Sequence, residues 1–373
     1  MLSNHFIGGR KLPKTISVLV KPASGRCNAS CKYCFYKDEA SLREQSDFGL
    51  MSLETAENLI AKALDFSSGG RIFFTFQGGE PTLAGLDFFK RFVAAVNEKN
   101  LSGTTVFYGL QTNGSLLAEA WAKFFKDNDF LIGLSLDGDK KADRLRTFSG
   151  GVPLFDSTVK AINLLTEYGV QFNVLSVLTK YSANNVETLY AFFKRHNLKY
   201  LQFVPCLRPL SERPTEDFYP TPKEYGNFLT KLFSLYVKDY LSGSFVSERK
   251  LDNFVRNYLG LPAELCGMNG HCNAGFVVEA NGNVYPCDFY ATDEYLLGNV
   301  NRQSFFEIAK NPKMIGFLQS SLKPREKCLS CKYFRVCRGG GCRRERQSED
   351  FCEAYKIFFE NSLPSFSVFE NEN

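Results

Sequence analysis

Several features that would assign a chain to a class of protein are scarce or missing here. The sequence has three histidines and one tryptophan among 373 residues, and its net charge is +5. So small an excess of positive charge does not indicate a nucleic acid as partner. Neither a P-loop nor a Ser-His-Asp signature is present. The chain therefore does not read as a P-loop nucleotide enzyme or a serine hydrolase.

Long hydrophobic stretches are missing as well. The longest apolar runs, such as residues 16–20, are far too short to cross a bilayer. Residues 1–14 lack the apolar segment of a secretory signal. We therefore expect a soluble, cytoplasmic protein with no membrane partner.

Cysteine, by contrast, is abundant, and it is clustered. Of the twelve cysteines, three lie within residues 27–34, eight lie between residues 266 and 352, and Cys206 stands alone. Cytoplasmic thiols stay reduced, so a disulfide scaffold is not expected. Clustered cysteines in such a chain indicate bound metal. We expect Cys206 to be a small core residue beside the site of the protein.

The first two thirds of the chain alternate between short strand-like runs and amphipathic helical patterns. The runs are β-branched and aromatic with little alternation, which is typical of strands buried on both faces. This order predicts a parallel α/β fold, and six strands favour a partial (β/α)6 barrel of TIM type with its site at the carboxyl ends of the strands. The expected strands are 16–20, 71–76, 104–110, 130–136, 172–178 and 200–204.

Beyond residue 220 the pattern changes. Thr221, Pro222 and Glu224 form a capping box with proline at the first helical position, which predicts a long helix to about Leu241. After residue 266 the chain is rich in cysteine and glycine and too poor in apolar runs to bury much core, so we expect bound metal to stabilise it. We predict a barrel domain at 1–240, a linker at 241–265 and a small cysteine-rich domain at 266–373.

The segment CNASCKYC places Cys27, Cys31 and Cys34 directly after the first expected strand. A four-iron cluster normally takes four thiolates, so three leave one iron open to another ligand. With Tyr33 between the last two cysteines, the motif resembles the radical S-adenosylmethionine superfamily. That resemblance implies a [4Fe-4S] cluster, S-adenosylmethionine on the open iron, and reductive formation of a 5′-deoxyadenosyl radical. The alternative is a zinc knuckle completed elsewhere.

Other strand ends fit the same family. The second strand ends in QGGEP, where glycines permit close backbone approach and Glu80 can accept a hydrogen bond from an ammonium group. By resemblance, the cofactor pocket is lined by Tyr33, Gly79, Glu80, Ser135, Arg146 and Leu207. The run DGDKKADRLR departs from the family pattern, so Arg144 competes with Arg146 for this role.

The eight later cysteines resemble the SPASM domain, which carries two auxiliary four-iron clusters. By that resemblance one cluster is held by Cys266, Cys272, Cys287 and Cys342, and the other by Cys328, Cys331, Cys337 and Cys352. Fully ligated clusters carry electrons but offer no open iron, which favours an oxidation. The alternative is a pair of zinc ribbons, because C-x2-C is also zinc spacing.

Five segments, namely residues 21–36, 76–89, 266–272, 284–290 and 339–344, together resemble anaerobic sulfatase-maturating enzymes. That family oxidises a cysteine or serine in a C/S-x-P/A-x-R motif of a sulfatase to Cα-formylglycine. The resemblance implies that Asp288 accepts the proton of the target and that Tyr36 and Gln77 face the substrate. It also implies an unfolded or nascent sulfatase as partner and a flavodoxin or ferredoxin as electron donor.

Two further hypotheses remain open at this stage. One is a radical enzyme with auxiliary clusters that forms a thioether or epimerises a residue in another peptide. The other is a non-enzymatic zinc protein. The choice between cysteine and serine as target is not decided by the sequence.

Overall fold

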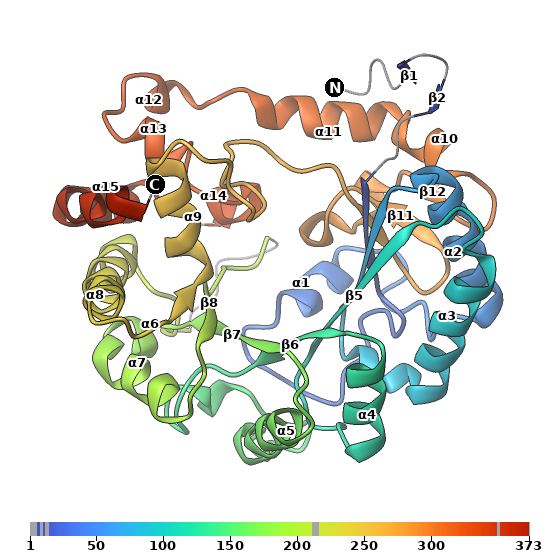
Figure 1. The fold of residues 1–373 in the computed structure, drawn as a ribbon, viewed down its shortest axis with the longest axis horizontal. Helices are drawn as coiled ribbons and strands as arrows, with labels where there is room; N and C mark the ends of the chain where they lie inside the picture. The colour runs from blue at the N-terminus through green and yellow to red at the C-terminus, as the bar shows by residue number, and fades with distance from the viewer. Residues whose placement is uncertain (1–5, 8–9, 12–14, 211–215, 349–350, 373) are drawn as a thin grey trace.

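The computed structural model describes residues 6–7, 10–11, 15–210, 216–348 and 351–372 (Figure 1). Near the amino terminus, β1 (Phe6–Ile7) and β2 (Arg10–Lys11) pair antiparallel as a separate two-stranded sheet. The rest of the described strands belong to one sheet of ten strands, in the order β12-β11-β10-β3-β4-β5-β6-β7-β8-β9.

Six consecutive parallel strands form the centre of this sheet, as the sequence predicted, and the α/β fold class is confirmed. Each lies within a few residues of its expected range because each run is bounded by polar or glycine-containing turns. The strands are β3 (Thr15–Val20), β4 (Arg71–Phe76), β5 (Thr105–Thr112), β6 (Leu131–Ser135), β7 (Phe172–Leu178) and β8 (Tyr200–Pro205).

The expectation that these strands are buried on both faces is wrong for the amino-terminal halves of β3, β4 and β5. In β4, Ile72, Phe74 and Phe76 are fully buried, whereas Arg71 is exposed and Phe73 is 38% exposed. The buried face packs against the helices, and the sheet does not close, so the opposite face is not filled at this end. Phe73 stacks instead on Phe107 of β5, with ring centroids 4.8 Å apart.

The helices that connect the strands follow one another around the outside of the curved sheet, whereas α1 appears inside the arc in Figure 1. The predicted Ser52 cap of α2 is present: the side chain accepts a hydrogen bond from the backbone of Thr55. This part contains α1 (Phe35–Ser41), α2 (Leu53–Ser67), η1 (Pro81–Ala84), α3 (Leu86–Lys99), α4 (Glu119–Asp127), η2 (Asp143–Leu145), α5 (Phe155–Glu167), α6 (Lys180–Ala183) and α7 (Val186–Arg195).

The long helix predicted after residue 221 is α8 (Pro222–Leu241). Its capping box is complete, because the Thr221 hydroxyl accepts from the Glu224 N–H and the Glu224 carboxylate accepts from the Thr221 N–H. The segment 241–265, predicted as a linker, contains β9 (Ser247–Glu248), which pairs with β8, and α9 (Arg249–Tyr258). Leu251 and Phe254 of α9 are fully buried, so this segment contributes to the core.

The carboxyl-terminal third extends the same sheet: β10 pairs parallel with β3, and β11 and β12 continue it antiparallel. The division into domains remains a prediction, since the sheet crosses it. The elements are β10 (Phe276–Val278), β11 (Asn283–Tyr285), η3 (Asp288–Tyr290), η4 (Asp293–Tyr295), β12 (Gly298–Asn299), α10 (Phe305–Ala309), α11 (Pro312–Leu322), α12 (Glu326–Leu329), α13 (Phe334–Cys337), α14 (Arg343–Ser348), α15 (Cys352–Ser362) and η5 (Leu363–Glu372).

Both large hydrophobic cores mix residues from the two parts of the chain. In one, Phe276 and Phe305 pack with Phe66 of α2. In the other, Phe358 of α15 packs with Phe233 of α8 and Phe254 of α9. Among the described residues, no helix combines the length and the apolar composition needed to traverse a bilayer.

Candidate active site

The first three cysteines lie in the loop between β3 and α1, at the carboxyl end of the parallel strands. Burial raises the pKa of Cys27 to about 12, and the nearby Glu80, Cys34 and Cys31 reinforce the shift. Burial likewise raises the pKa of Cys31 to about 11 and that of Cys34. Three thiols that are costly to ionise together fit a positively charged iron centre, because metal binding stabilises the thiolate form.

A glycine allows the neighbouring strand end to approach this loop. The Gly79 N–H donates to the Ser24 carbonyl at 2.9 Å, and the Glu80 N–H donates to the Arg26 carbonyl at 2.7 Å. A Cβ built on Gly79 would lie 1.9 Å from the Arg26 carbonyl oxygen, so no larger residue fits without moving the backbone. The GGE segment therefore supports the cysteine loop directly.

Glu80 is buried, and its carboxylate accepts hydrogen bonds inside the protein. Oε1 accepts from the Thr82 and Thr112 hydroxyls at 2.6 and 2.8 Å, and Oε2 accepts from the Asn113 N–H at 2.8 Å. These bonds join the end of β4 to the end of β5. The predicted contact between Glu80 and a cofactor ammonium stays a prediction.

A second buried polar cluster lies beside the cysteine loop, at the ends of β6 and β7. The Tyr33 hydroxyl donates to the Asp137 carboxylate, whose other oxygen accepts from the Val177 N–H at 2.8 Å. Arg146 pairs with Asp143 at 2.8 Å. Burial, together with the adjacent Asp143, raises the pKa of Asp137 to about 7.

Arg146 fits the cofactor role better than its competitor does. Arg146 is 2% exposed, and its Nη2 has no hydrogen-bond partner among the described residues. The carboxylate of S-adenosylmethionine would satisfy such a buried donor. Arg144 is exposed and donates to the Lys141 carbonyl. Of the other predicted pocket residues, Ser135 accepts from Gln111 at 2.9 Å, and Leu207 is half-buried beyond the end of β8.

The predicted base, Asp288, opens η3 immediately after Cys287 and faces the barrel. Its Oδ2 accepts a hydrogen bond from the Tyr36 hydroxyl at 2.5 Å and from the Gln77 amide at 3.4 Å. Its Oδ1 lies 3.1 Å from the ammonium of Lys21. The structure thus brings together three residues that the sequence placed on separate segments, and it adds a lysine that sequence reasoning missed.

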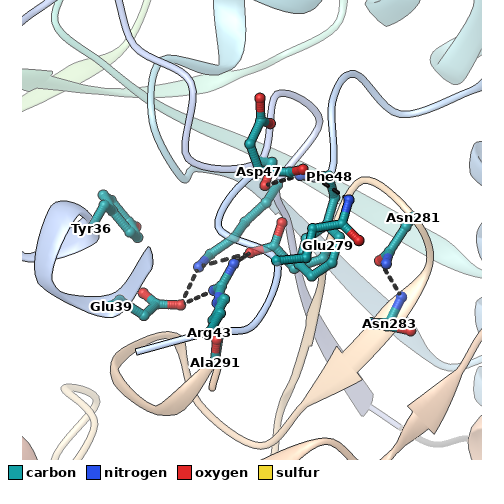
Figure 2. Close-up of polar contacts among 12 residues, drawn as sticks. Tyr36, Glu39, Arg43, Asp47, Phe48, Glu279, Asn281, Asn283 and Ala291 are labelled. Atoms are coloured by element: carbon teal, nitrogen blue, oxygen red, sulfur yellow. Dashed lines mark hydrogen bonds and ion pairs between the residues drawn. The ribbon is translucent and has the colours of Figure 1, made fainter. Parts of the chain in front are cut away.

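Lys21 belongs to a buried network of charged side chains. Figure 2 labels three other members of this network, Glu39, Arg43 and Glu279. The Lys21 ammonium lies 2.9 Å from Glu39 and 3.4 Å from Glu279. Arg43 pairs with both carboxylates and donates to the Ala291 carbonyl. Nothing in a single sequence distinguishes these charges from solvated ones, because their burial results from the packing of α1 against the segment after β10.

Four of the eight later cysteines, namely Cys266, Cys272, Cys287 and Cys342, lie close enough to influence one another's pKa. That they share one cluster stays a prediction. Burial raises the pKa of Cys287 and of Cys342, and each shift is reinforced by Cys266 nearby; Cys272 is likewise affected by Cys266. Gly267 permits this approach, because a Cβ there would lie 2.7 Å from the Gly341 carbonyl.

The second group lies at α12, α13 and α15. Burial raises the pKa of Cys337 to about 12, with Cys352, Cys328 and Cys331 close enough to add to the shift. All four line one cavity together with Tyr355 and Phe359. The donor set fits a fully ligated cluster, although no three His, Cys, Asp or Glu side chains in the described part converge on a single metal position.

Two other sequence features are also located. Cys206 is 3% exposed and packs with Leu145, Phe218 and Tyr219. Arg344, in the basic segment 343–346, is buried and donates to the Arg208 carbonyl. Arg343 lies over the rings of Tyr290 and Phe317.

Comparison with known proteins defines the class first. Residues 22–193 match the family model of the radical SAM superfamily, and residues 270–332 match that of an iron-sulfur cluster-binding domain. The chain is thus a radical SAM oxidoreductase with a SPASM domain, which requires [4Fe-4S] clusters and S-adenosylmethionine.

More specific relatives cover nearly the whole chain. A cysteine-type anaerobic sulfatase-maturating enzyme of Clostridium novyi is 41% identical, over 94% of this chain and 96% of the relative. A serine-type enzyme of Bacteroides thetaiotaomicron is 30% identical, over 96% and 92%. The solved structure of native anSMEcpe with bound AdoMet and Cp18Cys peptide has a TM-score of 0.90, with 39% identity over 96% of this chain and 99% of that chain. This chain belongs to the anaerobic sulfatase-maturating enzymes.

Proposed function

We propose that this protein oxidises a cysteine, and less readily a serine, in a C/S-x-P/A-x-R motif of a sulfatase to Cα-formylglycine. The observation that carries the proposal is the Asp288 carboxylate held between Tyr36, Gln77 and Lys21, directly beside Cys287. The relatives support it: those named as cysteine-type are 41% identical, whereas a serine-type relative is 30% identical.

The reaction removes one hydrogen atom, one proton and one electron from the target side chain. When bound, S-adenosylmethionine and the iron–sulfur clusters supply acceptors for the hydrogen atom from Cβ and for the electron. The protein itself must accept the proton from the thiol or hydroxyl, and Asp288 is placed to do so. For a cysteine target the product is a thioaldehyde, which water converts to the aldehyde with release of hydrogen sulfide.

The proposed role of each group of residues follows from its position. Cys27, Cys31 and Cys34 would hold the cluster that leaves one iron open, and Arg146, with Tyr33, Gly79, Glu80, Ser135 and Leu207 around it, would orient S-adenosylmethionine. Tyr36 and Gln77 fix Asp288 and would face the target. Cys266, Cys272, Cys287 and Cys342 would hold one electron carrier near the base, and Cys328, Cys331, Cys337 and Cys352 a second.

The partners follow from this chemistry. The Asp288 side chain is largely buried, so we propose that the target motif reaches it as an extended peptide and that the substrate is an unfolded or nascent sulfatase. An electron donor of flavodoxin or ferredoxin type would reduce the first cluster. A cytoplasmic location would keep the cluster thiols reduced.

The test is an anaerobic incubation of the reconstituted protein with S-adenosylmethionine, a reductant, and peptides that carry C-x-P-x-R or S-x-P-x-R. We expect mass spectrometry to show an aldehyde in the cysteine peptide, in higher yield than in the serine peptide. A peptide with alanine at the target position serves as control. If 5′-deoxyadenosine forms while neither peptide changes, the radical class stands and the sulfatase proposal is wrong.

A further inference from the structure

The carboxylate of Asp288 has a fully buried cation behind it. Lys21 is 1% exposed and lies at the end of β3, in the loop that leads to the three cysteines. Its ammonium contacts Oδ1 of Asp288, whereas Tyr36 and Gln77 both donate to Oδ2. The two oxygens therefore have different neighbours, and only Oδ2 is on the side of the predicted substrate-facing residues.

Lys21 is itself held in place from three sides. Glu39 of α1 and Glu279, which follows β10, lie 2.9 and 3.4 Å from its ammonium, and the ring of Tyr36 lies 4.8 Å away. Arg43 bridges the two glutamates, so neither can move toward solvent with the lysine. The position of the ammonium is consequently set by three separate segments of the chain.

The lysine also remains charged in this environment. Burial alone would lower the pKa of Lys21, but the neighbouring carboxylates of Asp288, Glu39 and Glu279 outweigh it and raise the pKa. Three carboxyl groups, those of Asp288, Glu39 and Glu279, face two cations here, so removing Lys21 leaves them with Arg43 alone. A buried carboxylate that loses its cation tends to turn away or to be neutralised.

We propose that Lys21 is a positioning residue for the oxidation: it holds Oδ1 of Asp288 so that Oδ2 stays beside Tyr36 and Gln77, where it accepts the proton of the target. The inference rests on the proposed function. Hydrogen-atom abstraction does not use Asp288, so loss of Lys21 separates the two halves of the reaction, with 5′-deoxyadenosine still formed and the aldehyde lost.

The experiment measures 5′-deoxyadenosine and aldehyde product in the same anaerobic reaction with the C-x-P-x-R peptide. For Lys21→Met we expect at least tenfold less aldehyde per 5′-deoxyadenosine than in the parent protein. We expect Lys21→Arg to recover most of that ratio. Asp288→Asn should itself lower the ratio strongly, and adding Lys21→Met to Asp288→Asn should lower neither product further, because the lysine then has no carboxylate to position.

The matched control replaces a lysine that pairs with a different buried aspartate. Lys194 of α7 lies 2.7 Å from both oxygens of Asp239, on the outside of the barrel. Lys194→Met is expected to lower stability while leaving the ratio of the two products unchanged. Iron content is measured for every variant, so that a loss of clusters is not read as a loss of positioning.

The outcomes are separable. If the parent protein makes no aldehyde, the proposed function fails and not only this inference. If the parent makes aldehyde and Lys21→Met gives an unchanged ratio, the inference is wrong. It is equally wrong if Lys21→Met lowers 5′-deoxyadenosine in both the parent and the Asp288→Asn background. Should Lys21→Met not retain its iron, Lys21→Gln, which keeps a donor without the charge, is held to the same criteria.

Discussion

At the scale of single residues, the site is built from buried charges whose partners come from distant segments. Arg146 is paired on one side with Asp143 and unpaired on the other. Glu80, by contrast, has both carboxylate oxygens occupied by Thr82, Thr112 and Asn113. A residue that retains an unpaired buried donor is a better candidate for holding a charged ligand than one that is fully satisfied.

This contrast gives a prediction for Arg146. Replacing Arg146 with methionine removes the free guanidinium donor, so the affinity for S-adenosylmethionine is expected to fall by at least tenfold, about 1.4 kcal/mol. Equilibrium binding to the anaerobically reconstituted protein measures the change. Arg144→Met, on an exposed side chain two residues away, is the control and should change affinity less than twofold. Equal losses in both variants would contradict the assignment.

At the scale of elements, the sequence predicted some helix caps and missed others. The box at Thr221 was predicted, whereas the box at Ser304, which has the same S/T-x-x-E pattern, was found only in the structure. The cap of α9 is Glu248, whose two oxygens accept from the Phe203 N–H at 3.0 Å and the Leu251 N–H at 2.9 Å. Glutamate is not a usual cap residue, and its role appears only once β9 is paired with β8 and the side chain is buried.

The burial of Glu248 predicts a dependence of stability on pH. Burial raises the pKa of Glu248 from 4.5 to about 7, so between these values the folded protein holds a proton that the unfolded chain releases. The contribution of this proton to the free energy of unfolding is therefore present at low pH and is lost as the pH rises from 4.5 toward 7. Glu248→Gln should remove this loss, an effect on the order of 1–3 kcal/mol.

Urea midpoints of the two proteins between pH 5.5 and 7.5 measure this effect. We expect the difference to move in favour of Glu248→Gln as pH rises. The control is Glu224→Gln in the exposed capping box of α8. There burial alone would raise the pKa of the carboxyl, but the hydrogen bonds from Thr221 and Asn184 together outweigh it and lower the pKa. The difference in urea midpoint between Glu224→Gln and the parent protein should stay constant between pH 5.5 and 7.5. A constant difference for Glu248→Gln as well would refute the prediction.

At the scale of the whole molecule, the carboxyl-terminal part is joined to the barrel through a common sheet and common cores. β10 pairs with β3, and Tyr355 and Phe358 of α15 pack in the core with Tyr225 of α8. These contacts place Asp288 opposite Tyr36 and Gln77. They also bring Cys342 back to Cys266, so that the second part supplies both the proposed base and the cysteines proposed to hold electron carriers.

The three proposed groups of cysteines predict how much iron the protein binds and how that amount responds to mutation. Three four-iron clusters require about twelve irons per chain. Cys342→Ala should reduce this to about eight, because it removes one thiolate from a single group. Cys206→Ala, at a buried cysteine outside all three groups, should leave it unchanged. Iron and sulfide analysis of the two reconstituted variants measures these contents. Zinc found in place of the missing iron would contradict the cluster assignment.

The sequence by itself determined the strand and helix pattern and the parallel barrel. These rest on local information: residue periodicity and turn chemistry. The assignment of eleven cysteines to three clusters came instead from the resemblance to known families, and it stays a prediction. The strand ends also placed Gly79, Glu80 and Ser135 at one edge of the sheet, since carboxyl ends of parallel strands meet there.

Only the tertiary structure showed that Arg146 is buried and Arg144 exposed, extended the sheet through β9–β12, and revealed the charged side chains around Asp288. Those side chains are Lys21, Glu39, Arg43 and Glu279. The physical reason is the same in each case. Burial and ion pairing depend on which segments pack against one another, and contacts between residues more than two hundred positions apart leave no periodicity in the chain. The local sequence around a lysine at a strand end is the same whether the side chain contacts solvent or three carboxylates.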